Sequence, residues 1–272
     1  MAKQTILITG STDGIGRQTA YELAALGHTV LIHGRSADRC QKTAEEIKKE
    51  TGNSDLYCFT ADLASLEQVR KLAGEVKSQF PSLNVLINNA GVFSKDKKIT
   101  KDGFELTFQV NHLSHYLLTV LLIDVLKRNS PSRIINVSST AHQSADFDIN
   151  NLQGESYYNS HNAYSLAKLC NLLFTFELAE KLKGTNVTVN ALHPGVISTK
   201  MLQDAFNMAG ASLKEGAETS VFLADSDEVS GKSGHYYVRK KEARVSSAAE
   251  NESNRKKLWE LSARLTGEEG NF

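Results

Sequence analysis

The chain has 272 residues, 40% of them hydrophobic and 23% charged, which is enough to bury the core of one large α/β domain or of two smaller ones. Lys plus Arg and Asp plus Glu number 31 each, so no net field favours nucleic acid as a partner. Cys40, Cys58 and Cys170 are too far apart for a metal site or a disulfide framework, and they indicate a reducing compartment.

The N-terminus leads directly into an apolar strand pattern, which leaves no room for a signal peptide. The longest apolar run, residues 116–123, is far shorter than the ~20 residues that a membrane helix needs. We therefore expect a soluble, cytoplasmic protein without a transmembrane segment.

A strand is predicted at residues 5–9, and an amphipathic helix that ends at Gly27 is predicted to follow it. The turn between them reads Gly10-Ser11-Thr12-Asp13-Gly14-Ile15-Gly16. A strand, a glycine turn and a helix present helix N-terminal amides to a phosphate, and glycines let a pyrophosphate approach the backbone. The spacing is G-x-x-x-G-x-G instead of the common G-x-G-x-x-G. The turn indicates either a phosphate site or a purely structural connection.

The end of the second predicted strand, residues 29–34, bears on cofactor choice. In NAD-binding units an acid at this place accepts bonds from the ribose 2′-hydroxyl, but here Gly34 stands there and Arg35 follows. An Arg suits a 2′-phosphate because its bonds are charge-assisted and often bidentate, and Arg39 would add to it. The alternative is a surface arginine. We expect NADP(H), with NAD(H) less favoured, and expect Gly34→Asp to shift the preference toward NADH.

Strands and helices alternate through the rest of the chain. This alternation predicts a parallel sheet of about seven strands with helices on both faces. The further strands are expected at residues 55–60, 85–87, 133–137, 187–192 and 234–238, and the helices up to residue 51, at 65–79, at 102–127, after residue 163, up to residue 224 and around 258–265.

Two polar positions stand out in this pattern. Asn111 lies in an apolar stretch of the helix at 102–127, where a buried amide requires a specific partner unless it is partly exposed. Ser138 and Ser139 follow the strand at 133–137. Ligands bind at the carboxyl ends of such strands, although serines there also form ordinary turns.

Tyr164 and Lys168 are four residues apart on a predicted helix and so share one face. A phenol has a reference pKa of about 10, and a neighbouring ammonium lowers it. The pair would then exchange a proton with an oxygen near neutral pH. The alternative is a chance pair, since this spacing occurs on many helices.

The C-terminal third offers weaker signals. Residues 200–213 are apolar but poorly periodic, as in a lid over a lipophilic site or a small packing helix. The basic runs at 239–241 and 255–257 are typical of solvated faces, with contact to an anionic membrane as the alternative. His112 and His115 lack an acidic or Cys companion, so no metal site is expected. No G-x-S-x-G motif of a hydrolase is present.

Taken in order, these motifs resemble those of the short-chain dehydrogenases/reductases along nearly the whole chain. Segments around Ser139, Tyr164 and Pro194, and the 25 positions from Ser139 to Tyr164, resemble the retinol-dehydrogenase-like branch. The resemblance implies a single-domain Rossmann fold over residues 1–272. The motifs are Thr9-Gly10-x-x-x-Gly14-x-Gly16, Asp62-Leu63, Asn88-Asn89-Ala90-Gly91, Asn111, Ser139, Tyr164-x-x-x-Lys168 and Pro194-Gly195-x-x-x-Thr199.

The resemblance also implies roles. Tyr164 exchanges a proton with the substrate oxygen, and Lys168 lowers the pKa of Tyr164 and holds the nicotinamide ribose. Ser139 hydrogen-bonds the substrate oxygen, and Asn111 orders a water that connects Lys168 to solvent. The implied cofactor contacts are Gly10, Ser11, Thr12, Asp13, Gly14, Ile15 and Gly16 for the pyrophosphate, Asp62 and Leu63 for the adenine, Asn89, Ala90 and Gly91 for the ribose, and Tyr164, Lys168, Pro194, Gly195, Val196 and Thr199.

The expected function is an NADP(H)-dependent oxidoreductase that interconverts a lipophilic alcohol with its aldehyde or ketone. The alternative is a catalytically silent dinucleotide-binding regulator or scaffold of the same fold. His142 and the segments at 143–162 and 200–213 are expected to shape an apolar pocket. Helices like those around Asn111 and Tyr164 often pair across a two-fold axis in this family, so a homodimer is the expected assembly to test.

Overall fold

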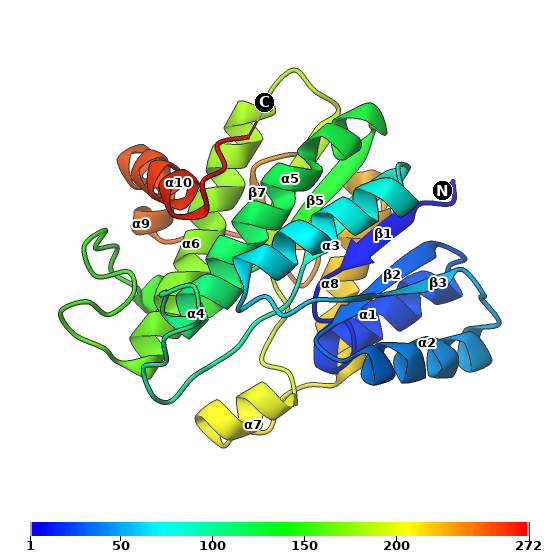
Figure 1. Ribbon diagram of the computed structural model, residues 1–272, viewed down its shortest axis with the longest axis horizontal. Helices are drawn as coiled ribbons and strands as arrows, with labels where there is room; N and C mark the ends of the chain where they lie inside the picture. The colour runs from blue at the N-terminus through cyan, green and yellow to red at the C-terminus, as the bar shows by residue number, and fades with distance from the viewer. Residues whose placement is uncertain (1, 271) are drawn as a thin grey trace.

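A computed structural model describes residues 2–270 and 272; Met1, Asn271 and the side chain of Phe206 lie outside the description. An eight-stranded sheet with the order β3-β2-β1-β4-β5-β6-β7-β8 forms the centre of the molecule (Figure 1). The strands are β1 Thr5–Ile8, β2 Thr29–Gly34, β3 Leu56–Thr60, β4 Leu83–Asn88, β5 Ser132–Val137, β6 Val187–His193, β7 His235–Val238 and β8 Lys241–Glu242.

The first seven strands are parallel, and only β8 pairs in the antiparallel direction. The predicted doubly wound parallel sheet is confirmed. β8 has two residues, which is too short for an alternating pattern, so the sequence did not indicate it.

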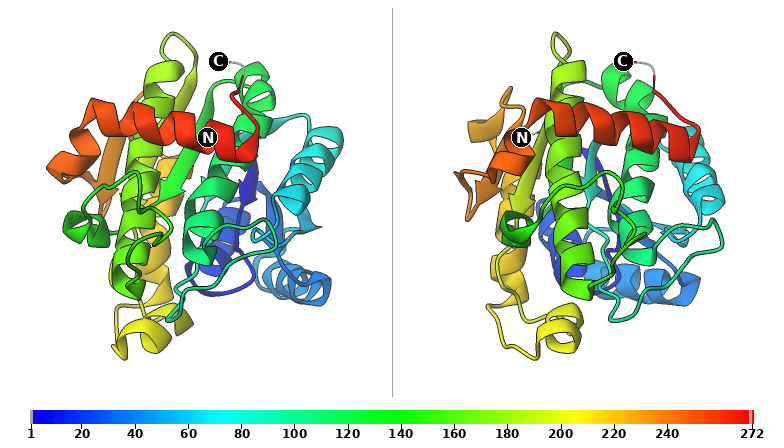
Figure 2. Two further views of the ribbon diagram at one scale, coloured as in Figure 1. Left: turned by 60° about the vertical axis from the view of Figure 1, so that its left-hand side comes forward. Right: turned by 90° about the vertical axis from the view of Figure 1, so that its left-hand side faces the viewer.

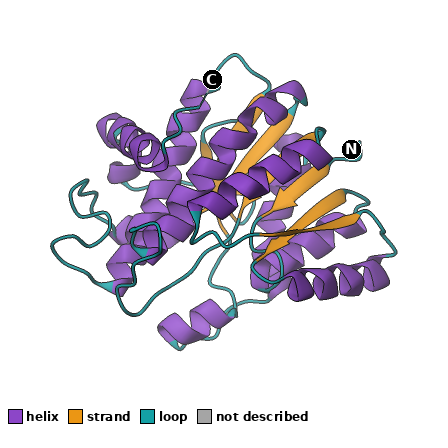
Figure 3. Ribbon diagram, viewed as in Figure 1, coloured by secondary structure: helices purple, strands orange, loops and turns teal. Residues whose placement is uncertain are grey.

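Helices cover both faces of the sheet (Figure 3). Leu7, Leu31 and Leu86 point to the face covered by α3 Leu66–Gln79, α5 Ser114–Arg128 and α6 Ser160–Lys181. Ile6, Ile8 and Ile32 point to the opposite face, which packs against α1 Gly14–Ala25, α2 Ala37–Thr51 and α8 Leu213–Asp225. Because successive residues alternate between two buried faces, the strands are apolar almost without interruption.

The helix predicted at 102–127 is divided. A short α4, Leu106–Phe108, begins where Glu105 caps it, since the Glu105 carboxylate accepts from Phe108 N at 2.7 Å. A π-helical turn, Gln109–Leu113, follows and carries Asn111; α5 continues from Ser114. π-turns inside helices are frequent at functional sites.

The combined segment Leu106–Arg128 is long and apolar enough to cross a membrane. In the described part of the chain it is the only such helix, and 89% of its most apolar window is buried inside the protein. That burial is typical of the core helix of a sheet protein, because α5 fills one face of the sheet.

The C-terminal segment packs against the outer side of the helices that cover one face of the sheet. After α9, Ser247–Glu250, the helix α10, Glu252–Thr266, crosses α5 and α6 (Figure 2). The Trp259 ring lies 5.0 Å from Tyr116 of α5 and is stacked 6.0 Å from Phe174 of α6. Part of the surface that the expected homodimer would use is therefore covered by the chain itself. The dimer stays a prediction, and the mass from light scattering tests it.

The segment at 200–213 contains a short helix, α7 Lys200–Phe206, which projects near the carboxyl ends of the strands (Figure 1). Thr199 caps α7 by accepting from Leu202 N at 3.2 Å. Asn207, at φ 48°, ends α7 in the left-handed conformation that Asn tolerates. The poor periodicity of this stretch thus reflects one isolated helix with little packing.

Candidate active site

Ser139, Tyr164 and Lys168 meet at the carboxyl end of β5. Tyr164 and Lys168 stand one turn apart on α6, and the Lys168 ammonium lies 5.5 Å from the centroid of the Tyr164 ring. The Tyr164 phenol is hydrogen-bonded to the side chain of Ser139. The Lys168 ammonium donates to Val137 O at 3.0 Å. The spacing in the sequence therefore does bring these groups together.

The acidity of the pair differs from the expectation. Burial raises the pKa of Tyr164 to about 12, and the hydrogen bond with Ser139 offsets only part of this rise. Burial also lowers the pKa of Lys168 to about 8. The expectation that Lys168 holds the Tyr164 pKa below its reference is wrong for this structure, because desolvation of the phenol outweighs the hydrogen bond with Ser139. At neutral pH, Tyr164 is a phenol that has a proton to give.

Asn111 is fully buried in the π-turn, so the partly exposed alternative is excluded. Its Oδ1 accepts from Val92 N at 2.7 Å, and its Nδ2 donates to Val92 O at 2.9 Å. A Cβ on the adjacent Gly91 would lie 3.5 Å from Asn111 Oδ1 and 3.6 Å from Lys168 Nζ. The Asn111 side chain thus clamps the loop after β4 against Lys168; its expected role toward a water stays a prediction.

The glycine turn connects β1 to α1 as predicted. Gly10 and Gly14 have φ of 66° and 55°, which favour glycine, and a Cβ on Gly16 would collide with Asn89 Nδ2 and Gly10 O. Asp13 caps α1, since its Oδ1 accepts from Gly14 N at 2.8 Å. Backbone conformation and packing are therefore enough to explain these glycines. The amino end of α1 faces the site, where its free N–H groups would bind a phosphate.

Ser11 and Thr12 differ in their surroundings. The buried Ser11 hydroxyl donates to Ile8 O at 2.8 Å and accepts from His33 N at 2.9 Å, so it shapes the turn from inside. A Cβ on Gly34 would lie 2.6 Å from Thr12 Cγ2 and 3.1 Å from Cys40 Sγ. A side chain at position 34 would require the Thr12 side chain to move, and the expected effect of Gly34→Asp on cofactor choice stays a prediction.

Charged groups surround the end of β2. Arg35 is exposed and forms no ion pair with any residue of the described chain. Arg39 Nη2 lies 3.3 Å and Lys200 Nζ 3.5 Å from Asp13 Oδ2. Asp13 therefore already binds two cations, one from α2 and one from α7.

The remaining expected cofactor residues lie along the same edge of the sheet. Asn89 N and Ala90 N both donate to Thr9 Oγ1 at 2.9 Å, which ties the loop after β4 to the glycine turn. Asp62 Oδ1 accepts from Ala64 N at 3.0 Å, and Leu63 is buried. The segment of Pro194, Gly195 and Val196 follows β6 and leads to Thr199, whose Cγ2 would lie 3.6 Å from a Cβ on Gly14. Their contacts with a nucleotide stay predictions.

The expected pocket residues are only partly at the site. His142 is fully buried, and its expected role in shaping the pocket stays a prediction. Tyr157 is 65% exposed, and Tyr158 Oη donates to Ser94 O at 3.0 Å, which holds two loops together. The ring of Phe93 lies 6.0 Å from Tyr164, and sequence reasoning missed it. Its place two residues after the Asn88-Asn89-Ala90-Gly91 motif was the available signal.

The described residues include no group of three or more His, Cys, Asp or Glu side chains that could hold a metal ion. Cys40 and Cys170 are free and buried, and Cys58 is free and exposed. The groups that meet at the carboxyl end of β5 are a hydroxyl, a phenol and an ammonium group.

Comparisons with known proteins agree with this geometry. The sequence pattern of the short chain dehydrogenase family matches residues 4–210. Retinol dehydrogenase 14 of Homo sapiens is 42% identical over 98% of this chain and 87% of its own length. Retinol dehydrogenase 13 of Homo sapiens is 40% identical over 97% and 85%.

Solved structures show the same fold. An uncharacterised protein from Mycobacterium paratuberculosis superposes with a TM-score of 0.85 at 31% identity, over 100% of this chain and 96% of that one. A protein described as an NAD(P)-dependent gluconate 5-dehydrogenase from Beutenbergia cavernae, with bound NADP, gives a TM-score of 0.73 at 26% identity, over 88% and 96%.

The chain belongs to the short-chain dehydrogenase/reductase family. It is thus an oxidoreductase of a family that binds nicotinamide dinucleotides, and it is similar over nearly its whole length to retinol dehydrogenases. The resemblance predicted from the motifs is confirmed.

Proposed function

We propose that this protein is an NADP(H)-dependent oxidoreductase that interconverts a lipophilic alcohol with its aldehyde or ketone. The observation that carries the proposal is the Tyr164 phenol, hydrogen-bonded to Ser139 beside the Lys168 ammonium at the carboxyl edge of the sheet. The similarity to retinol dehydrogenases and the Phe93 ring next to Tyr164 support an apolar substrate.

Each of the three site residues has a separate role in the proposed reaction. The nicotinamide cofactor, when bound, supplies or accepts the hydride. The Ser139 hydroxyl orients the substrate oxygen and stabilises charge that develops on it. Tyr164 gives its proton to that oxygen during reduction and takes it back during oxidation. The positive charge of Lys168 favours the phenolate that remains, and its ammonium donors would hold the ribose hydroxyls.

The donors present fit a phosphorylated dinucleotide. The first amides of α1 would bind the pyrophosphate, and the unengaged Arg35 would bind a 2′-phosphate in a fork. A charge-assisted hydrogen bond contributes roughly 1.5–3 kcal/mol. One such contact corresponds to about a tenfold to hundredfold preference for NADP(H).

The activity is tested by NADPH consumption with a panel of aldehydes and ketones that runs from short aliphatic compounds to retinaldehyde. We expect turnover with the apolar members, and we expect Tyr164→Phe to abolish it while NADPH still binds. If NADPH binds but no carbonyl compound gives turnover that Tyr164→Phe abolishes, the silent regulator or scaffold is the better description. A strict preference for small charged substrates would contradict the apolar pocket.

The cofactor choice is tested by Arg35→Ala. We expect the KM for NADPH to rise at least about tenfold, the lower bound for one lost charge-assisted contact, and the KM for NADH to change little. Arg128→Ala removes an exposed arginine from the end of α5 and is the matched control. Equal losses with both cofactors in Arg35→Ala would show that Arg35 supports the fold, and the NADP(H) assignment would be withdrawn.

We also propose that the enzyme works in the cytoplasm. Its three free cysteines suit a reducing compartment. Cell fractionation tests this location, and recovery of the protein in a membrane fraction that salt does not release would contradict it.

A further inference from the structure

Two buried histidines contact the main chain of site residues in the same way. His115 lies on α5, and His142 lies in the short 3₁₀ helix Thr140–Ser144 after β5. Their exposed fractions are 1% and 0%. His115 Nδ1 lies 3.1 Å from Asn111 O, and His142 Nδ1 lies 2.6 Å from Ser139 O. Each imidazole therefore meets the main chain of a site residue.

The partners fix the tautomer of both rings. A carbonyl oxygen only accepts, so Nδ1 carries the hydrogen in each ring and Nε2 accepts. His142 Nε2 accepts from Ser246 N at 3.3 Å, and an amide can only donate. His115 Nε2 lies 3.2 Å from Thr9 Oγ1, whose one hydroxyl hydrogen is shared between this nitrogen and Ile87 O at 3.4 Å. Every ring nitrogen thus has a partner of the correct polarity.

Both rings are neutral at physiological pH. Burial lowers the pKa of His115 to about 3, and the charge of Lys168 acts in the same direction, against the carbonyl of Asn111. Burial also lowers the pKa of His142, against the carbonyl of Ser139. A neutral ring keeps one donor and one acceptor, so the hydrogen-bond polarity described above persists.

The far partners connect each site residue to a distant part of the chain. Thr9 Oγ1 also accepts from Asn89 N and Ala90 N, so His115 links the Asn111 turn to the glycine turn and to the loop after β4. His142 links Ser139 to Ser246, which lies outside the residues 4–210 that the family pattern matches. The two contacts therefore bridge the site to the dinucleotide side and to the C-terminal segment.

We propose that His115 and His142 are positioning residues, which hold the main chain of Asn111 and of Ser139 in place through Nδ1–H and brace it through Nε2. They act through these neighbours and touch no reacting atom. Their expected effect on turnover rests on the proposed function, whereas the assignment of their tautomers does not depend on it.

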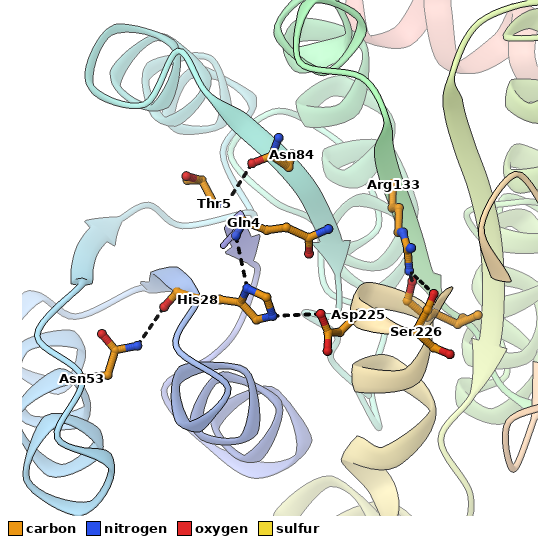
Figure 4. A network of polar contacts seen from close by, with 9 residues as sticks. Gln4, Thr5, His28, Asn53, Asn84, Arg133, Asp225 and Ser226 are labelled. Atoms are coloured by element: carbon orange, nitrogen blue, oxygen red, sulfur yellow. Dashed lines mark hydrogen bonds and ion pairs between the residues drawn. The ribbon is translucent and has the colours of Figure 1, made fainter. Parts of the chain in front are cut away.

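The first test needs no activity. Nitrogen-15 NMR of histidine-labelled protein should show His115 and His142 as neutral Nδ1–H tautomers at about pH 8. His28 is the internal reference: Gln4 N donates to its Nδ1, which leaves the hydrogen on Nε2 toward Asp225 (Figure 4). Single His→Asn variants assign each signal. An Nε2–H tautomer or a charged ring at His115 or His142 would overturn the proposal for that residue.

The second test is kinetic, with NADPH and a carbonyl compound that the wild type reduces. At each histidine, Asn keeps a donor near the Nδ1 position, Gln keeps a polar group near the Nε2 position, and Leu removes both. We expect kcat to fall least in Asn, more in Gln and by about tenfold to hundredfold in Leu, because small misplacements at a site are costly. The rescue by Asn relative to Gln is the outcome that a purely structural role would not produce.

The matched control is the same series at His28, which is 3% exposed and lies at the opposite end of the sheet. Its variants should lower Tm and leave kcat unchanged. The proposal fails if the His115 and His142 series lose kcat only in proportion to Tm, or no more than the His28 series. If a Leu variant does not fold, the comparison of kcat between the Asn and Gln variants still tests the proposal. If the wild type shows no turnover, the proposed function is refuted, and the NMR result alone decides the proposal for the two histidines.

Discussion

The amino and carboxyl ends of the parallel strands both hold hydrogen-bonded polar side chains, but their partners differ. At the amino ends, His28 lies between Gln4 N and Asp225, and Arg133 Nη1 donates to Leu223 O and Ser226 O at 2.9 Å each (Figure 4). These bonds join the starts of strands to the end of α8. The groups satisfy one another and stabilise the fold.

The carboxyl ends contain groups that burial has moved from their ordinary acidity. The pKa of Tyr164 is raised to about 12 and that of Lys168 is lowered to about 8, both by desolvation. Such perturbed groups are concentrated at functional sites. One end of the sheet therefore contributes stability, while the other holds ionisable groups in a form that burial disfavours and that catalysis can use.

The largest effect that would sharpen this contrast is on catalysis. Tyr164→Phe removes the proton donor, and general acid–base catalysis contributes about 10²- to 10⁴-fold, so kcat should fall at least about a hundredfold. Tm should change little, because the ring that faces Phe93 is kept. Steady-state kinetics and thermal unfolding measure both. A loss below tenfold would mean that another group supplies the proton.

The next effect concerns the stability of the carboxyl end. An unfolded lysine titrates near 10.5 and Lys168 near 8, so its charge opposes folding below pH 8. Between these values only the unfolded state keeps the proton, and stability rises with pH across that window. Lys168→Met removes the penalty and should stabilise the protein at pH 7, on the order of 1–3 kcal/mol. The gain should shrink toward pH 10.

Denaturant unfolding at the two pH values measures this difference, and Lys214→Met, at an exposed position on α8, is the control. A less stable Lys168→Met at pH 7 would show that the lost bond to Val137 O outweighs the relief of burial.

The amino end should show the converse behaviour. His28→Leu leaves Gln4 N and Asp225 without their partner, which costs about 0.5–1.5 kcal/mol for each hydrogen bond lost. The free energy of unfolding should fall by that amount while kcat and KM keep their wild-type values. A changed kcat at equal folded fraction would break the comparison, since it would couple the two ends of the sheet.

The smallest expected effect concerns the ion pairs of Asp13, which lies between the glycine turn and the cations near the end of β2. Asp13→Asn keeps the cap on α1, since Asn caps as well as Asp, and releases Arg39 and Lys200. Exposed ion pairs contribute about 0.2–1 kcal/mol, so the KM for NADPH should fall up to about fivefold and that for NADH should stay constant. A rise in the KM for NADPH would show that Asp13 itself supports the nucleotide site.

Local sequence patterns are sufficient to predict the secondary-structure elements and the order of the motifs. β2 coincides with its predicted range because apolar residues run between Gly27 and Gly34. The spacing of Tyr164 and Lys168 placed them on one helix face because helical geometry is local. These features depend on neighbours within a few residues, so a pattern can reveal them.

How the site residues are held depends on contacts between distant parts of the chain. The direction of the Tyr164 pKa depends on burial by distant segments, which residue spacing does not encode. The lack of room at Gly34 comes from Thr12 and Cys40, and the burial of His142 from contact with Ser246 and Tyr236. Desolvation, steric exclusion and long-range hydrogen bonds arise only when remote parts of the chain pack together, and they set the chemistry that the motifs alone left open.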